Sequence, residues 1–187
     1  MRRNRSAISL VLCALFAALI AVCSQIQIPL AVIPINLALF AVHLCGALLG
    51  PVYGGLSVLV YLLLAAAGAP VMAGFQGGLG ILLGKTGGYA VGYILTAVIV
   101  GAGERYWGRK FWQLCICMAV GVAVCYGFGT VWYMILSGNS LGVSLAYCVW
   151  PFLPGDVLKI LLAAALAIQL RKPLASILPE KKKKESD

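Results

Sequence analysis

Long apolar runs, separated by short breaks rich in glycine and proline, dominate this sequence. Its mean hydropathy is +1.02, and 10% of its 187 residues are charged, against about 25% in soluble globular domains. So few charges cannot cover the surface of a soluble domain of this length. The composition therefore excludes an ordinary cytosolic enzyme, a disordered protein and a secreted disulfide scaffold. It indicates a helical integral membrane protein.

Six runs are long enough to cross a compact membrane bundle, where a spanning helix needs about 20 residues or slightly fewer. They are Ala7–Cys23, Pro34–Leu49, Val52–Ala67, Leu79–Gly101, Trp112–Leu136 and Pro154–Leu170. The break at Gly50-Pro51 is the weakest, so five spans with one long bent segment is the competing count. We expect a single all-α membrane domain over residues 1–187, with six helices across about 7–170 and a basic tail over 171–187.

Positive charge decides between the two counts. The basic clusters are Arg2, Arg3 and Arg5; Arg105, Arg109 and Lys110; and Arg171, Lys172 and Lys181–Lys184. With six spans all three clusters lie on one side, and the opposite loops, 24–33, 68–78 and 137–153, contain no Lys, Arg, Asp or Glu. The positive-inside rule therefore favours six spans with both termini in the cytoplasm. The net charge of +9 then reflects cytoplasmic loops and gives no reason to expect a nucleic-acid partner.

Cysteine and histidine give no sign of catalysis or metal binding. The 7 cysteines are irregularly spaced and lie mostly in apolar runs, which favours a role as small packing residues over metal or disulfide roles. The single histidine, His43, lies in the middle of a span, where a packed and hydrogen-bonded side chain is expected. No catalytic group set or nucleotide-binding loop is present, so the chain is not expected to be an enzyme.

The predicted topology places three charged residues in the outer half of the membrane: Lys85, Asp156 and Lys159. A charge at such depth costs roughly 2–3 kcal/mol or more, so each needs a partner. Asp156 and Lys159 are three residues apart and share a helix face, so they can pair with each other. That pairing does not explain why Lys159 lies one turn deeper, whereas a pocket open to the outside for a small acidic ligand does.

The segments near these charges suit such a pocket. The loop Gly74–Gly78 combines glycines with Phe75 and Gln76, Tyr89 follows a glycine pair, and Trp150 precedes Asp156. Aromatic residues at this depth also form the ordinary interfacial belt. Together, however, they can form an apolar wall around a few polar groups, which is the usual composition of a small-molecule site.

Small residues recur at a spacing of four in two predicted helices, which lets helix backbones approach closely in lipid. For Gly84, Gly88 and Gly92 we favour packing within the chain over contact with another membrane protein. For Ala14 and Ala18 the spacing alone does not decide between the two.

Four segments resemble one family. They are Trp150-Pro-Phe-Leu-Pro-Gly-Asp-Val-Leu-Lys159, Gly80-Ile-Leu-Leu-Gly-Lys-Thr-Gly-Gly-Tyr89, Leu49-Gly-Pro-Val-Tyr-Gly-Gly55 and Gly68-Ala-Pro-Val71. They are similar to the BioY family, the biotin-binding S components of energy-coupling factor (ECF) transporters. The resemblance covers about residues 7–170, and the Pro-Gly-Asp-x-x-Lys stretch is its most specific part.

The resemblance implies an S-component fold in a bacterial inner membrane, capture of biotin from outside, and no cofactor of its own. It also implies coupling to a module of one transmembrane scaffold protein and two cytoplasmic ATPases, which alone use ATP. Asp156 and Lys159 would hold biotin, and the Ala14/Ala18 pair would dock on the scaffold protein. The further candidate ligand-binding residues are Gln76, Tyr89, Lys85, Phe75, Thr86, Gly78, Asn36 and Trp150.

Two positions depart from the usual family pattern. Lys85 replaces the proline of Pro-Thr-Gly-Gly-Tyr, and Asn36 stands in Pro-Ile-Asn-Leu-Ala where Pro-Ile-Thr-Leu-Gln is usual. Lys85 could supply an extra cation for a carboxylate. Two alternatives stay open: an S component for another small acidic vitamin, and a ligand-free scaffold subunit in which Asp156 and Lys159 only pair with each other.

Overall fold

A computed structural model describes residues 2–28, 35–174 and 177 of the chain. The helices are α1 (Arg2–Gln25), α2 (Ala38–Ala66), α3 (Leu79–Leu82), α4 (Gly87–Tyr106), α5 (Phe111–Ser137), α6 (Leu141–Cys148) and α7 (Leu153–Leu174). The short strands β1 (Gln27–Ile28) and β2 (Ile35–Asn36) pair antiparallel. Pro34 of the second predicted span and Lys181–Lys184 of the predicted tail lie outside the described residues.

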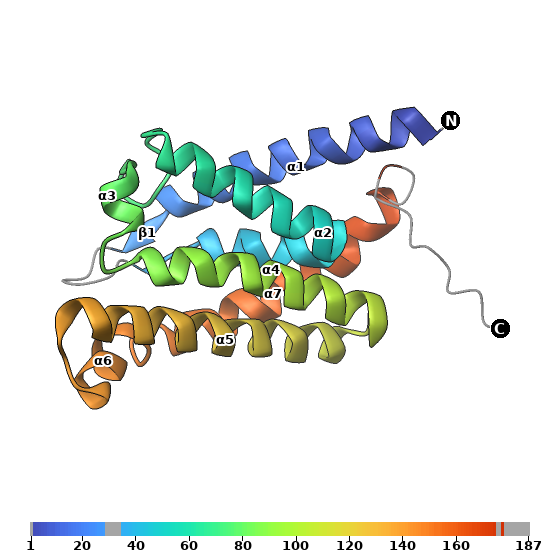
Figure 1. The fold of residues 1–187 in the computed structure, drawn as a ribbon. Coiled ribbons are helices and arrows are strands. Elements are labelled where there is room, and N and C mark those ends of the chain that lie inside the picture. Colours follow the sequence, from blue (N-terminus) through green and yellow to red (C-terminus); the bar gives the residue numbers. More distant parts are fainter. Residues whose placement is uncertain (1, 29–34, 175–176, 178–187) are drawn as a thin grey trace.

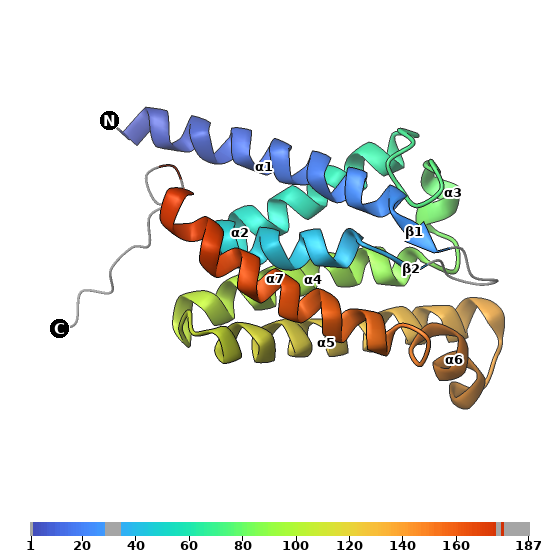
Figure 2. The ribbon, with the colours of Figure 1, turned by 180° about the vertical axis from the view of Figure 1, so that it is seen from behind.

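Five described helices, α1, α2, α4, α5 and α7, are long and apolar enough to cross a membrane. They form a bundle in which α3, α6 and the β1–β2 hairpin gather at one end (Figures 1 and 2). The beginning of α1, the α4–α5 turn and the end of α7 lie at the other end. The prediction of a helical, multi-pass membrane protein is confirmed by this arrangement.

The chain reverses direction inside α2. Gly50 has φ 79° and ψ −177°, which are not helical angles, and Pro51 follows it. A Cβ on Gly54 would lie 3.1 Å from the Cα of Gly46, whereas eight residues of continuous helix span about 12 Å. The Sγ of Cys45 also donates to the carbonyl of Gly54 at 3.6 Å. The two halves of α2 therefore run back along each other from the predicted Gly50-Pro51 break.

Two predicted element boundaries are wrong. The predicted span Leu79–Gly101 is divided, because residues 83–86 leave the helix between α3 and α4. A Cβ on Gly87 would collide with the carbonyl of Leu82, so this tight turn depends on glycine. The predicted loop 137–153 contains helix α6.

Glycines allow α4 to pack closely against its neighbours. A Cβ on Gly88 would collide with Trp132 of α5, and one on Gly92 would lie 2.7 Å from the Sγ of Cys125. Packing within the chain is therefore confirmed for these two residues, while Gly84 lies before α4 begins. All seven cysteines are buried and free of disulfides, as their packing role predicts.

A buried carboxylate ties helix ends together at the end of the bundle where α1 begins. Glu104 of α4 is 3% exposed and forms ion pairs with Arg109 Nε and Arg171 Nη1, each at 2.6 Å. Arg171 also donates to the carbonyl of Ala47 at 3.2 Å, close to the reversal in α2. We call Glu104, Arg109 and Arg171 the Glu104 ion cluster. It joins α4, the α4–α5 turn, α7 and α2.

Candidate functional site

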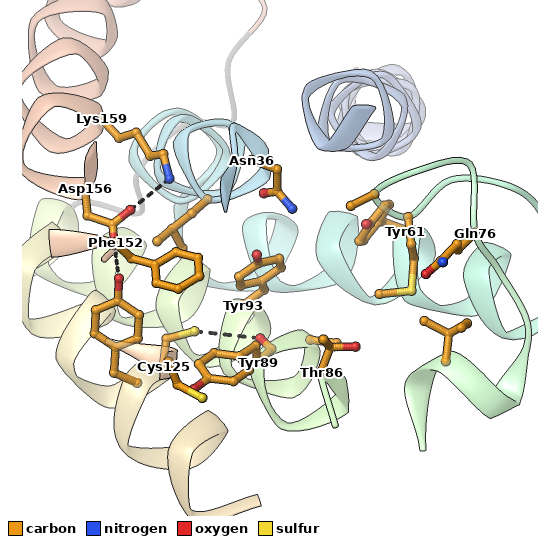
Figure 3. A pocket seen from close by; sticks show the side chains of 17 residues that line it. Asn36, Tyr61, Gln76, Thr86, Tyr89, Tyr93, Cys125, Phe152, Asp156 and Lys159 are labelled. Carbon is orange, nitrogen blue, oxygen red and sulfur yellow. Dashed lines mark hydrogen bonds and ion pairs between the residues drawn. The ribbon is translucent and has the colours of Figure 1, made fainter. Parts of the chain in front are cut away.

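A cavity lies at the end of the bundle where α3 and α6 gather (Figure 3). Its volume is about 110 Å³, and its lining is mostly apolar. Its lining residues come from β2, both halves of α2, the loop that follows α2, and α3 to α7: Asn36, Leu39, Tyr61, Met72, Ala73, Gln76, Ile81, Thr86, Tyr89, Ala90, Tyr93, Cys125, Tyr126, Cys148, Phe152, Asp156 and Lys159.

An ion pair forms one wall of the cavity. Lys159 Nζ donates to Asp156 Oδ1 at 2.9 Å, and the two residues are 6% and 3% exposed. Both lie on α7, where Asp156 is in the first turn and its negative charge is favourable beside the helix N-terminus. The pairing expected from their spacing is thus present, and both side chains line the cavity, so the pair does not face lipid alone.

A tyrosine of α5 bonds the second oxygen of this carboxylate. Tyr126 OH donates to Asp156 Oδ2, the oxygen that Lys159 does not engage. The Tyr126 ring packs edge-on against Tyr89, with ring centroids 6.4 Å apart at 77°. Tyr89 OH in turn lies 3.3 Å from Thr130 Oγ1. Helices α4, α5 and α7 therefore meet in one polar and aromatic contact network.

The remaining lining supplies a broad aromatic surface. The rings of Tyr61, Tyr89, Tyr93 and Phe152 surround the space between the ion pair and Gln76 in Figure 3. A Cβ on Gly129 would collide with the ring of Tyr89, so glycine at 129 leaves room for this ring. Flat apolar walls with a few polar groups suit a compact ligand that carries both apolar and polar parts.

The loop over residues 68–78 is fastened to the end of α1. Ser24 Oγ donates to the carbonyl of Val71 at 2.5 Å, and Gln25 Nε2 donates to the carbonyl of Met72 at 2.9 Å. Gln25 Oε1 also accepts from the backbone N–H of Phe75 at 2.9 Å. This loop brings Met72, Ala73 and Gln76 to the cavity, so the cavity wall depends on contacts with α1.

The predicted ligand-binding residues divide into two groups. The cavity lining contains Asp156, Lys159, Gln76, Tyr89, Thr86 and Asn36. The lining does not contain Lys85, Phe75, Gly78 and Trp150. Of these, Phe75 is 71% exposed and Trp150 66%, and Lys85 is also exposed. A ligand contact for this second group stays a prediction.

Sequence reasoning missed most of the tyrosines. Tyr61, Tyr93 and Tyr126 line the cavity, as do Cys125 and Cys148. The spacing of Tyr89 and Tyr93 by four residues was an available signal, since it places both on one helix face. For Tyr126 no local signal exists, because its partner Asp156 is 30 residues away.

His43 is buried as predicted, but the prediction that its side chain is hydrogen-bonded is wrong. It is fully buried, and within the described part of the chain neither ring nitrogen has a hydrogen-bond partner. The surrounding residues of α2, Val42, Leu44 and Cys45, are buried and apolar. Among the described residues, no group of three or more His, Cys, Asp or Glu side chains could hold a metal ion.

Comparison with known proteins gives one consistent relationship. A sequence model described as the BioY family matches residues 1–176. A protein named biotin transporter BioY from Thermotoga maritima is 37% identical over 84% of this chain and 92% of its own length. A probable biotin transporter BioY from Pyrococcus horikoshii is 36% identical over 86% of this chain and 94% of its own length.

A solved structure shares the fold. It is the crystal structure of the S-component for biotin from an ECF-type ABC transporter, with a TM-score of 0.84 and 30% sequence identity. The match covers 92% of this chain and 95% of that one. The expected S-component fold is confirmed by this similarity.

Proposed function

The chain belongs to the BioY family, and on that premise we propose that it is the biotin-binding S component of an ECF transporter. It captures biotin at the outer membrane face and delivers it inward with an ATP-driven module. The observation that carries this proposal is the cavity in which the Asp156–Lys159 pair faces a wall of tyrosines.

The chemistry of the cavity matches the two ends of biotin. Its ureido group carries two N–H donors and one carbonyl, and its valerate chain ends in a carboxylate. Asp156 is an acceptor for N–H groups, whereas Lys159 has donors for a carbonyl or a carboxylate. Gln76, Thr86, Tyr89 and Asn36 supply further polar groups, and the aromatic rings pack on the apolar parts of the ligand.

Four predicted contacts require the outer loops to close over the ligand. Phe75 and Gly78 belong to the loop 68–78, Lys85 to the turn before α4, and Trp150 to the segment after α6. We propose that the loop 68–78 acts as a lid, with Lys85 reaching the ligand carboxylate on closure. The hydrogen bonds from Ser24 and Gln25 support this role, because they hold the loop at the cavity.

We propose six membrane crossings, with both termini in the cytoplasm of a bacterial cell and the domain in its inner membrane. The reversal at Gly50 supports this count, since it divides α2 into two antiparallel halves. The beginning of α1, the α4–α5 turn and the end of α7 carry the basic residues and share one end of the bundle. The cavity lies at the other end, where the loops 68–78 and 137–153 contain no Lys, Arg, Asp or Glu.

ATP-driven transport by this protein would need an ATPase on another chain, because no segment of this sequence matches a nucleotide-binding loop. We propose a module of one transmembrane scaffold protein and two cytoplasmic ATPases, with docking through Ala14 and Ala18 of α1. Both alanines are exposed on an α1 face that also carries Val11, Leu15 and Val22. An outward row of small residues suits close helix–helix contact in lipid.

Calorimetry on detergent-solubilised protein tests the assigned site. Biotin should bind the wild type, and Asp156→Asn and Lys159→Ala should each lower the affinity; unchanged affinity in both variants rejects the site. A thermal-shift panel of vitamins separates the alternatives, since a ligand raises the melting temperature of the state that it binds. Stabilisation by another vitamin alone indicates a different substrate, and none by any vitamin indicates a scaffold subunit.

A further inference from the structure

Each oxygen of the Asp156 carboxylate receives one donor from the protein before any ligand enters. Lys159 Nζ engages Oδ1, and Tyr126 OH engages Oδ2. A carboxylate has about four lone-pair sites, so two donors do not saturate it. The two donors come from different helices, α7 and α5, and together they restrict rotation of the carboxylate about its side-chain bonds.

Tyr126 is itself held in place by packing. Its ring is partly buried against Tyr89, and Tyr89 is fixed between Thr130 and the flat surface that Gly129 provides. A donor whose own position is set by packing can orient its acceptor, whereas a mobile donor would follow it. Lys159 is a poorer orienting group, because its ammonium ends a flexible stem with rotatable donors.

We infer that Tyr126 is a positioning residue that fixes the Asp156 carboxylate so that its free lone pairs face the N–H donors of the ligand. This inference rests on the proposed function, since it assigns Asp156 to the donor end of biotin. An ionised carboxylate only accepts hydrogen bonds, so a carboxylate that is fixed toward the cavity binds a ligand that presents donors there and repels one that presents acceptors. Tyr126 therefore contributes to selection for the ureido group as well as to affinity.

A double-mutant cycle tests the inference by calorimetry of biotin binding to the wild type, Tyr126→Phe, Asp156→Asn and the double variant. Tyr126→Phe should weaken binding about tenfold, as expected for loss of a hydrogen bond to a charged group. In the Asp156→Asn background the same change should alter affinity by less than about twofold, because a residue that acts through another has no effect once that other is changed. Biotin-dependent thermal shifts extend the range to weak variants.

Tyr133→Phe is the matched control. Tyr133 lies on the same helix, is 3% exposed, bonds Asn139 and does not line the cavity. It should bind biotin as the wild type does. If neither the wild type nor this control binds biotin, the proposed function fails. If both bind and Tyr126→Phe binds equally well, or loses the same factor in both backgrounds, the positioning role is overturned.

Infrared difference spectra decide the case in which Asp156→Asn has no measurable affinity. Removing the Tyr126 hydroxyl should shift a carboxylate stretching band of the ligand-free protein, and the shift should be missing when Asp156 is already Asn. A merely structural tyrosine would not move that band. An unchanged carboxylate band in Tyr126→Phe overturns the inference.

Discussion

The protein buries a carboxylate near each end of its bundle, and the two have different surroundings. Asp156, near the end where α3 and α6 gather, is bonded by one lysine and one tyrosine and lines a cavity. Glu104, near the opposite end, is bonded by two arginines and is not among the residues that line this cavity. Burial is the same, at 3% exposure each. The difference lies in access to the cavity, which Asp156 lines and Glu104 does not.

This comparison distinguishes a carboxylate that stabilises the fold from one that can bind a ligand. The donors around Glu104 come from segments that must stay together, so its charge joins helix ends. The carboxylate of Asp156 keeps lone pairs on the side of the cavity, where water or a ligand can reach it. We therefore expect Glu104 variants to lose stability with little change in affinity, and Asp156 variants to show the reverse.

The largest expected effect is on stability. Glu104→Gln leaves two arginines without their anion, and breaking a buried ion pair in this way typically costs about 3–5 kcal/mol. The melting temperature of the ligand-free protein should fall accordingly, while the biotin Kd of the folded fraction stays within about twofold of wild type. A melting temperature equal to that of wild type would remove the distinction between the two carboxylates.

The second largest effect is expected on biotin affinity, in Asp156→Asn. This variant loses hydrogen bonds of a charged acceptor to the ligand, each of about 1.5–3 kcal/mol, so the biotin Kd should rise about a hundredfold in calorimetry. The ligand-free melting temperature should fall less than in Glu104→Gln, because water in the cavity can solvate Lys159. A larger fall in Asp156→Asn would reverse the comparison and assign the outer pair a mainly structural role.

A smaller effect is expected from Gln25→Ala, which removes two hydrogen bonds that fasten the loop 68–78 to α1. Each neutral hydrogen bond contributes about 1 kcal/mol, so biotin dissociation should accelerate about fivefold or more in stopped-flow displacement. Gln169→Ala, at an exposed position on α7, is the control and should leave the rate unchanged. An unaltered rate in Gln25→Ala would mean that the loop does not retain the ligand.

The smallest effect is expected from Lys85→Ala, which extends the comparison to an exposed cation near the cavity. An exposed ion pair contributes about 0–1 kcal/mol, so the biotin Kd should rise at most about fivefold, and less at high salt. A loss as large as that of Lys159→Ala would show that Lys85 becomes buried against the ligand carboxylate.

Much of the fold could be predicted from the sequence because lipid imposes simple rules. Long apolar runs located the spanning helices, and Gly50-Pro51 marked the reversal in α2. The break before α4 was missed because it depends on contacts that are distant in sequence. Trp132 Nε1 of α5, for example, donates to the carbonyl of Gly84 at 3.0 Å, and the two residues are 48 positions apart.

The candidate site was predictable in its charges and not in its tyrosines. A charge in the outer half of a membrane is costly, so Asp156 and Lys159 stood out without any structure. Tyrosine is common in apolar runs and at interfaces, so Tyr61 and Tyr126 carried no such signal. For His43 a general rule gave the wrong prediction. Buried polar groups usually have hydrogen-bond partners, but neither ring nitrogen of His43 has one among the described residues.

The backbone at Gly50 has a consequence for how the protein enters the membrane. In the proposed topology the 29 residues of α2 leave the outer face and return to it, so they contribute two crossings and not one. The φ of 79° at Gly50 is readily adopted only by glycine. A side chain that straightened this segment would remove one crossing and place everything after it, including Asp156, on the wrong side of the bilayer. The orientation of the C-terminal half therefore depends on a residue that touches neither the cavity nor the charges.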